Sequence, residues 1–140
     1  MSLNPKGFLP IYHFYAMFDK LMFSFSKISG LKNAVEFKAI AEGGSNQLAI
    51  LPDQSTQSNS VTFERPSTTT DKIFNITVTP GTPFNIISIF ITQGSIPRKL
   101  ITLNPCLVTS VSYSELDATQ SGIVIETIDI AYGHLSSITM

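Results

Sequence analysis

The side chains best suited to chemistry are two histidines and one cysteine, and their spacing does not bring them together. His13 and His134 stand near opposite ends of the 140-residue sequence, with no cysteine or pair of carboxylates close to either in sequence. Metal sites need such ligands at short, regular spacings, so we expect no metal or cofactor site and a structural or surface role for both histidines. Cys106 lies between Pro105 and Leu107, which suggests a small buried hydrophobic side chain rather than a nucleophile.

Paired carboxylates occur twice, and neither pair has the arrangement that general acid–base catalysis needs. Glu115 and Asp117 belong to a polar segment, where a solvated charge is the ordinary outcome. Glu126 and Asp129 fall at odd spacing on an expected strand, so they point to opposite faces of the sheet. The segment 42–45, Glu-Gly-Gly-Ser, lacks the glycine spacing and the Lys-Ser/Thr ending of a phosphate-binding loop. We therefore expect a protein that is not an enzyme.

The composition is that of a folded, weakly charged protein. Hydrophobic residues make up 43% of the chain, enough for one domain with its own core. Charged residues contribute only 14% and the formal net charge is −1, so there is no global field to hold a nucleic acid or an anionic membrane. No apolar run reaches the length of a membrane span. Such a surface fits either a subunit of an assembly or an ordinary monomer with a polar, uncharged surface.

The longest regular pattern runs from Leu107 to Tyr132 and predicts two strands joined by a polar loop at residues 114–122. Alternate side chains of a strand lie on opposite faces of the sheet. In the second strand this rule separates two sets of residues, Ile123, Ile125, Thr127, Asp129 and Ala131 on one face and Val124, Glu126, Ile128, Ile130 and Tyr132 on the other.

The first half of the chain also reads as short strands. Residues 12–18 and 21–28 flank a turn at Asp19-Lys20 and predict a hairpin, although a helix over residues 12–22 has compatible spacing. Further alternating or apolar segments at residues 35–40 and 48–51 flank a glycine-containing loop. Residues 60–65 predict a strand with Val61 and Phe63 facing inward.

The middle of the chain contains one ambiguous segment. Residues 72–79 fit a short helix or a strand, and their β-branched content favours the strand. Residues 84–92 predict a strand buried on both faces, residues 98–103 predict another, and Asn104-Pro105 predicts a bend or an edge. Strands at this spacing predict a mainly β fold, an antiparallel β-sandwich or barrel with at most one short flanking helix. We divide the chain into an N-terminal arm at 1–10, a β domain at 11–135 and a C-terminal tail at 136–140.

Several segments, taken in order, resemble the tail tube family of contractile phages. The segments that carry the resemblance are Phe23–Leu31, Val35–Lys38 followed by Glu42–Asn46, Leu51-Pro52 followed by Val61–Arg65, and Ser114–Ser121 followed by Ile123–Gly133. Together they span residues 12–135. The chain departs from the family in having no tryptophan, where the family carries a Trp-containing helix after the strand that ends at Arg65. The sequence therefore leaves open whether residues 67–83 form the helix that the family carries there.

The resemblance implies a structural subunit of the inner tube of a contractile phage tail or a phage-tail-like injection particle. The family is similar in fold to the tube protein of type VI secretion. The expected partners are further copies of the chain in stacked hexameric rings, sheath and baseplate proteins, and cargo or DNA in the lumen. The resemblance also implies assembly in the bacterial cytoplasm, and the N-terminus, which lacks the long apolar core of a signal peptide, agrees with this expectation.

One loop is the candidate site for contacts between stacked rings, and it consists of Glu42, Gly43, Gly44, Ser45 and Asn46. An ordinary hairpin loop is the plainer interpretation. The alternative function is a monomeric or dimeric β-sandwich module that binds sugar or peptide through its loops.

Overall fold

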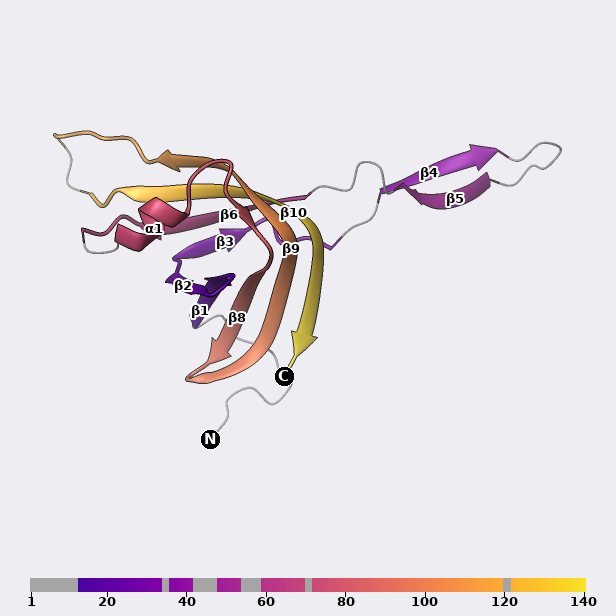
Figure 1. Cartoon of the computed structure of the whole chain (residues 1–140), viewed down its shortest axis with the longest axis horizontal. Helices are drawn as coiled ribbons and strands as arrows, with labels where there is room; N and C mark the ends of the chain where they lie inside the picture. Colours follow the sequence, from indigo (N-terminus) through magenta and orange to yellow (C-terminus); the bar gives the residue numbers. More distant parts are fainter. Residues whose placement is uncertain (1–12, 34–35, 42–47, 54–58, 70–71, 120–121) are drawn as a thin grey trace.

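A computed structural model of the chain describes residues 13–33, 36–41, 48–53, 59–69, 72–119 and 122–140. Ten strands and one short helix occur in these residues (Figure 1). In chain order they are β1 (His13–Phe18), β2 (Leu21–Ser24), β3 (Lys27–Ser29), β4 (Glu36–Ala41), β5 (Leu48–Asp53), β6 (Asn59–Pro66), α1 (Lys72–Thr77), β7 (Pro83–Phe84), β8 (Ile87–Gln93), β9 (Ile96–Tyr113) and β10 (Ile125–Thr139).

The strands form one eight-stranded antiparallel sheet and one separate hairpin. The order in the sheet is β2-β1-β8-β9-β10-β6-β3, with β7 paired to β9 off this path. Strands β4 and β5 form the separate two-stranded sheet. The expected antiparallel, mainly β fold with one short helix is thus confirmed.

The sheet is strongly curled, and β8, β9 and β10 bend together along their length (Figure 1). The register shifts between Ile91 and Thr92 where β8 meets β9, and between Asp129 and Ile130 where β10 meets β9. Such irregularities bend a strand and increase its local twist. The two long strands β9 and β10 therefore carry the curvature from one end of the sheet to the other.

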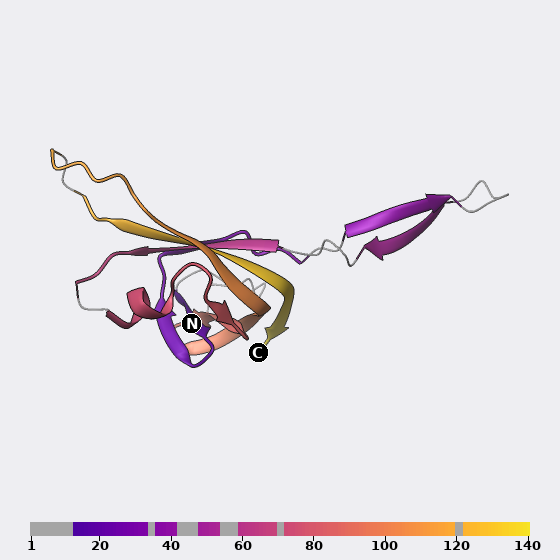
Figure 2. The same ribbon diagram turned by 45° about the horizontal axis from the view of Figure 1, so that its top comes forward.

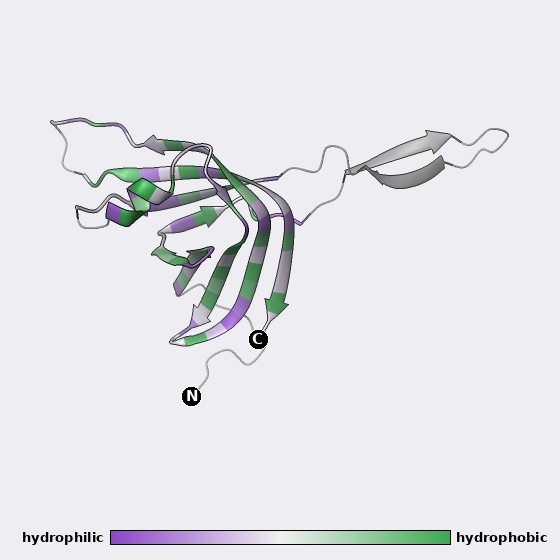
Figure 3. Ribbon diagram, viewed as in Figure 1, coloured by the Kyte–Doolittle hydropathy of each residue, from purple (hydrophilic) through white to green (hydrophobic). Residues whose placement is uncertain are grey.

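Aromatic side chains fill the inside of the curl. The ring of Phe18 on β1 contacts four other buried phenylalanines, Phe23, Phe25, Phe63 and Phe84, with centroids 5.1–5.7 Å away. The coloured strands in Figure 3 show apolar and polar positions alternating, as a sheet with one buried face requires. Val61 and Phe63 are fully buried, which confirms their predicted inward orientation.

The segment at residues 72–79 is a helix over its first six residues, so the preference for a strand was wrong. Phe74 and Val78 are both buried, and the Val78 amide donates to the Phe74 carbonyl at 2.8 Å. This i, i+4 spacing puts both side chains on one helical face, where Phe74 packs on Phe23 and Phe25. Packing on the aromatic core therefore outweighs the β-branched propensity of the segment.

Three other expectations differ from the structure. Strand β8 is buried at alternate positions (Ile87 and Ile89) and only partly at Ser88 and Phe90, so it is not buried on both faces. The strand predicted at residues 98–103 does not end there, because β9 continues through Asn104-Pro105 and pairs with β10 on both sides of that dipeptide. Residues 136–139, expected as a tail, continue β10 and pair with residues 99–102 of β9.

Candidate assembly surfaces

The hairpin of β4 and β5 projects away from the curled sheet in both views (Figures 1 and 2). Its two strands pair from Glu36 opposite Asp53 to Ala41 opposite Leu48. The candidate contact residues 42–46 connect these strands in sequence and lie outside the residues that the structure describes. Each strand of the hairpin pairs only with the other among the described strands.

The connection that leads from the sheet toward this hairpin is anchored by one tyrosine. Tyr132 on β10 is 1% exposed, and its hydroxyl oxygen lies 3.0 Å from the Lys32 amide, which donates to it, and 2.8 Å from the Lys32 carbonyl, which accepts from it. Gly30 has a φ of +90°, and a Cβ at this position would lie 2.8 Å from the Ser60 carbonyl oxygen. The chain therefore leaves β3 in a conformation and at a distance from β6 that only glycine accommodates.

The curled sheet has two edges, formed by the short strands β2 and β3. Each of them pairs on one side only within the part of the chain that the structure describes. An edge strand presents amide and carbonyl groups to which another strand can pair. Two edges on one subunit suit contacts that repeat from copy to copy.

Two further surfaces expose apolar side chains. The β9–β10 connection carries Leu116 and Ile123, which are 76% and 70% exposed. Between the β1–β2 turn, the end of α1 and the start of β8 lies an open groove of about 590 Å³ with a mainly apolar lining that includes Leu21 and Ile86. Exposed apolar surface of this kind is typical of contacts with another molecule.

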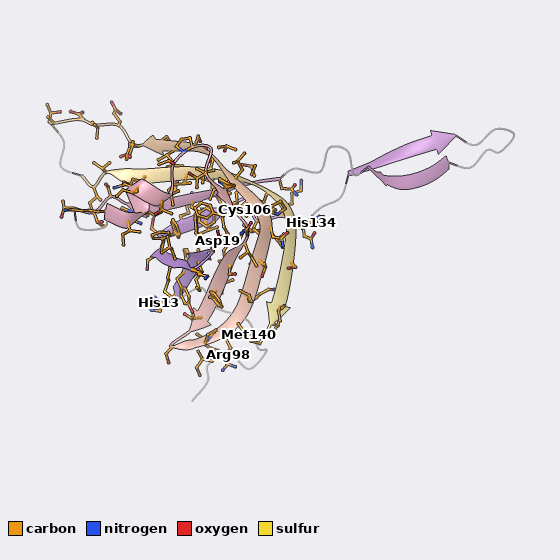
Figure 4. The ribbon with its side chains drawn as sticks, viewed as in Figure 1. His13, Asp19, Arg98, Cys106, His134 and Met140 are labelled. Atoms are coloured by element: carbon orange, nitrogen blue, oxygen red, sulfur yellow. The ribbon has the colours of Figure 1, made fainter. Side chains whose placement is uncertain are left out.

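The residues considered for chemistry stay apart in the structure. His13 on β1 and His134 on β10 are both exposed and lie in separate regions of the molecule (Figure 4). The described residues hold no group of three or more His, Cys, Asp or Glu side chains that could bind a metal ion. Burial raises the pKa of the Cys106 thiol to about 12, as expected for an inert buried cysteine.

The two carboxylates of β10 point to opposite faces, as the strand pattern predicts. Asp129 accepts hydrogen bonds on the outer face from the hydroxyls of Thr62 at 2.7 Å and Ser110 at 2.8 Å. Glu126 points inward and lies 3.8 Å from Nε of Arg65 on β6, with both side chains nearly fully buried. Neither carboxylate faces an open cavity beside a second acid, so the structure offers no acid–base pair here.

The buried ion pair was missed, although the sequence contains a signal for it. Arg65 follows Val61 and Phe63 at every second position, which places it on the inner face of β6. Its guanidinium carbon lies 4.1 Å from the centre of the Phe74 ring on α1, and Ser67 donates to the Glu126 carboxylate at 3.0 Å. The ion pair thus joins β6, β10 and α1.

Comparison with known proteins identifies the family. Residues 10–136 match the family model described as T4-like virus tail tube protein gp19. No curated protein sequence matches the chain. No helix among the described residues is long and apolar enough to cross a membrane.

Several solved structures share the fold at low sequence identity. A chain of the sheath-tube complex of an extracellular contractile injection system, PVC, is 18% identical with a TM-score of 0.80, covering 100% of this chain and 99% of that one. A chain of the tube-terminating cap of the anti-feeding prophage is 17% identical with a TM-score of 0.78, covering 100% and 97%. Hcp1 from Flavobacterium johnsoniae is 11% identical with a TM-score of 0.56, covering 90% and 94%.

The family match and the fold agree with the resemblance seen in the sequence, and they do not favour the alternative of a sugar- or peptide-binding module. The family model spans most of the chain, including every strand of the curled sheet except the last three residues of β10. The protein belongs to the T4-like virus tail tube protein family and is a structural subunit of the inner tube of a contractile tail or tail-like particle.

Proposed function

We propose that copies of this chain close into hexameric rings by head-to-tail contacts, and that the rings stack into a tube with a central lumen. The observation that carries the proposal is a curled sheet with an edge at each end, β2 and β3, on a subunit with a projecting hairpin. A head-to-tail contact that closes under rotation forms a ring, and closure removes free edges. The function is mechanical: contraction of a surrounding sheath drives the tube through a target envelope while cargo or DNA passes along the lumen.

The partners proposed for the tube follow from its place in such a particle. The structural neighbours come from a sheath-tube complex, a tube-terminating cap and a six-fold symmetrised baseplate. We infer that this chain likewise meets sheath and baseplate proteins of its own particle and assembles with them in the bacterial cytoplasm. The formal net charge of −1 fits a subunit whose sides are mostly covered by its neighbours.

Ring formation is tested by negative-stain electron microscopy of the purified protein together with its mass from light scattering. Rings of about six subunits, or hollow tubes, are expected because a closed ring covers both sheet edges. A protein that remains monomeric in the presence of the sheath and baseplate proteins of its own particle would contradict the proposal.

The loop at residues 42–46 is proposed to contact the neighbouring ring in the stack. Its support is the position of these residues between β4 and β5, whose hairpin is separate from the curled sheet. Replacing Glu42 and Asn46 by alanine should shorten the tubes while leaving single rings and the unfolding midpoint unchanged. Ser137→Ala, at an exposed position on β10, is the matched control. Tubes of normal length in the double variant would remove this loop from the contact.

A further inference from the structure

The outer face of the curled sheet carries a continuous row of apolar side chains at one end. Tyr15 on β1 lies opposite Phe90 on β8, and their rings stack with centroids 5.0 Å apart. Phe90 lies opposite Leu100 on β9, which in turn lies opposite Ile138 on β10. Cross-strand partners lie side by side on one face of a sheet. These four residues, here called the outer apolar row, therefore form one band across four strands.

The outer apolar row faces away from the core. Ala16, Ile89 and Ile101, each next in sequence to a member of the row, are buried in the core. Because successive residues of a strand point to opposite faces, the members of the row point outward. Ile138 is 57% exposed and the other three members are partly exposed. A contiguous apolar patch of this kind is typical of a surface that another segment or molecule covers.

Farther along the same outer face, the cross-strand partners of β6, β9 and β10 are mainly polar. Asp129 accepts hydrogen bonds there from the hydroxyls of Thr62 and Ser110. Ser112 lies opposite Thr127. This part of the face is suited to water, so the outer apolar row is the part that calls for a cover.

The chain enters the sheet beside the outer apolar row. His13 begins β1 two residues before Tyr15, and its carbonyl accepts a hydrogen bond from the Thr92 hydroxyl at 3.2 Å. Strand β8 ends at Gln93, one residue beyond the partner of His13. It therefore offers almost no further residues with which the chain ahead of His13 could pair.

Residues 1–12 lie outside the described residues, and their sequence suits an apolar surface. Their only charged side chain is that of Lys6. Their large apolar residues after the first methionine are Leu3, Phe8, Leu9, Ile11 and Tyr12. Pro5 and Pro10 lack the amide proton that a regular strand needs, so a contact of this segment with the sheet would be made by side chains.

We propose that the segment 1–12 folds back over the outer apolar row of its own chain, with Phe8 and Leu9 on Phe90 and Leu100. An extended chain advances about 3.3 Å per residue, so Phe8 can lie up to about 16 Å from His13. Leu100 lies two strands across and two residues along from His13, about 12 Å away at the usual strand spacings. The segment is therefore long enough to reach it.

The tether identifies the occupant as the same chain. A segment attached close to its binding surface has an effective concentration of the order of millimolar. A second copy of the chain would have to match that concentration to displace it. The cover is thus expected whether or not rings have formed, and the inference goes beyond the proposed ring.

Disulfide cross-linking tests the contact. In Phe8→Cys/Leu100→Cys and Leu9→Cys/Leu100→Cys, mild oxidation should give an internal disulfide in at least one variant, seen as a single-chain mass with faster migration in a denaturing gel. A disulfide requires Cβ atoms about 4 Å apart. Phe8→Cys/Ser112→Cys is the matched control, because Ser112 is exposed on the same face of β9 but twelve residues farther along, and it should link at least about tenfold more slowly. Cys106 is buried in every variant.

A second measurement keeps the sheet unchanged and alters only the segment. Replacing Phe8 and Leu9 by serine should speed the alkylation of Leu100→Cys by at least about tenfold and leave that of Ser112→Cys unchanged. No internal disulfide in either variant, disulfides that join two chains, or unchanged alkylation of Leu100→Cys would each overturn the inference. Each of these results leaves the proposed ring standing, because none of them depends on assembly.

Discussion

Removing the hydroxyl of Tyr132 tests whether one buried side chain holds the connection between the sheet and the β4–β5 hairpin. The hydroxyl accepts from the Lys32 amide at 3.0 Å and lies 2.8 Å from the Lys32 carbonyl and 3.3 Å from the Gly30 carbonyl, either of which accepts its proton. Tyr132→Phe keeps the buried ring and deletes only these polar contacts.

The structure sets the size of the expected effect. The hydroxyl takes part in one accepted and one donated hydrogen bond, each with a net contribution of about 1 kcal/mol. Lys32 is itself exposed, so water can replace part of what its amide loses. We therefore expect Tyr132→Phe to lower the free energy of unfolding by about 1.5 kcal/mol.

The measurement is urea-induced unfolding of the unassembled chain at one fixed protein concentration, because ring formation would otherwise add to the apparent stability. Tyr113→Phe is the control, since Tyr113 is 58% exposed near the end of β9, and it should change the free energy by less than about 0.5 kcal/mol. Amide exchange should also become faster at Lys32 in Tyr132→Phe. Equal stability losses in both variants, with unchanged exchange at Lys32, would refute the anchoring role.

Three other predictions follow from single contacts. Gly30→Ala should destabilise the chain by at least about 1 kcal/mol in thermal unfolding, because its φ is +90° and the new Cβ would meet the Ser60 carbonyl oxygen at 2.8 Å; a wild-type midpoint would contradict this. Phe18→Leu should lower the free energy of unfolding in urea by about 2 kcal/mol, because it removes four ring contacts. Phe90→Leu removes one stacked contact, with Tyr15, and should lower the free energy of unfolding clearly less. Cys106 should resist alkylation at pH 8 until the chain unfolds, because the pKa of its thiol is about 12 in the folded chain against 9.0 for the free thiol. Rapid labelling of the folded chain would count against its burial. The thiol of the unfolded chain ionises at lower pH than that of the folded chain, so this group lowers the free energy of unfolding as the pH rises from 9 toward 12.

Strand patterns with one buried face could be recognised from the sequence alone. The hairpin of β1 and β2, with Asp19 at a φ of 55° in its turn, follows the prediction as far as Ser24, and the rival helix over residues 12–22 was wrong. The strand predicted at residues 21–28 is divided, because its second part belongs to β3 and pairs with β6. Ile128, Ile130 and Tyr132 are buried as the period-two pattern predicts. These strands can be predicted from their alternating hydrophobicity because one of their faces packs on a core and the other does not.

The helix α1 shows why other elements could not be predicted in this way. Ile73 and Ile76 are 58% and 78% exposed, so the most hydrophobic residues of this segment do not mark its buried face. Phe74 and Val78 mark it instead, because the rings of Phe23 on β2 and of Phe25 just after it lie where Phe74 can pack on them. That arrangement depends on residues about fifty positions earlier in the chain, which no local pattern contains.

The candidate site was predictable only in part, for a related physical reason. Residues 42–46 were chosen by family resemblance, and their role remains a prediction because they lie outside the described residues. The exposed apolar side chains of Leu116 and Ile123 were predicted simply as part of a polar connection, since two apolar side chains in a polar segment do not alter its turn chemistry. Whether such a side chain is covered depends on the tertiary structure, and here the structure leaves both exposed.

The buried pair of Arg65 and Glu126 suggests how the sheet and the helix are held in one arrangement. Replacing such a pair by well-packed apolar residues is often neutral or stabilising, so the pair by itself is weak evidence for stability. Its partners are more informative, because Arg65 also stacks on Phe74 and Glu126 also accepts from Ser67. These contacts are directional and join β6, β10 and α1, so a shifted helix would remove the Phe74 ring from the buried guanidinium of Arg65. The end of α1 forms part of the apolar groove beside the β1–β2 turn, so a directional buried contact to the helix also fixes the position of that wall better than apolar packing alone.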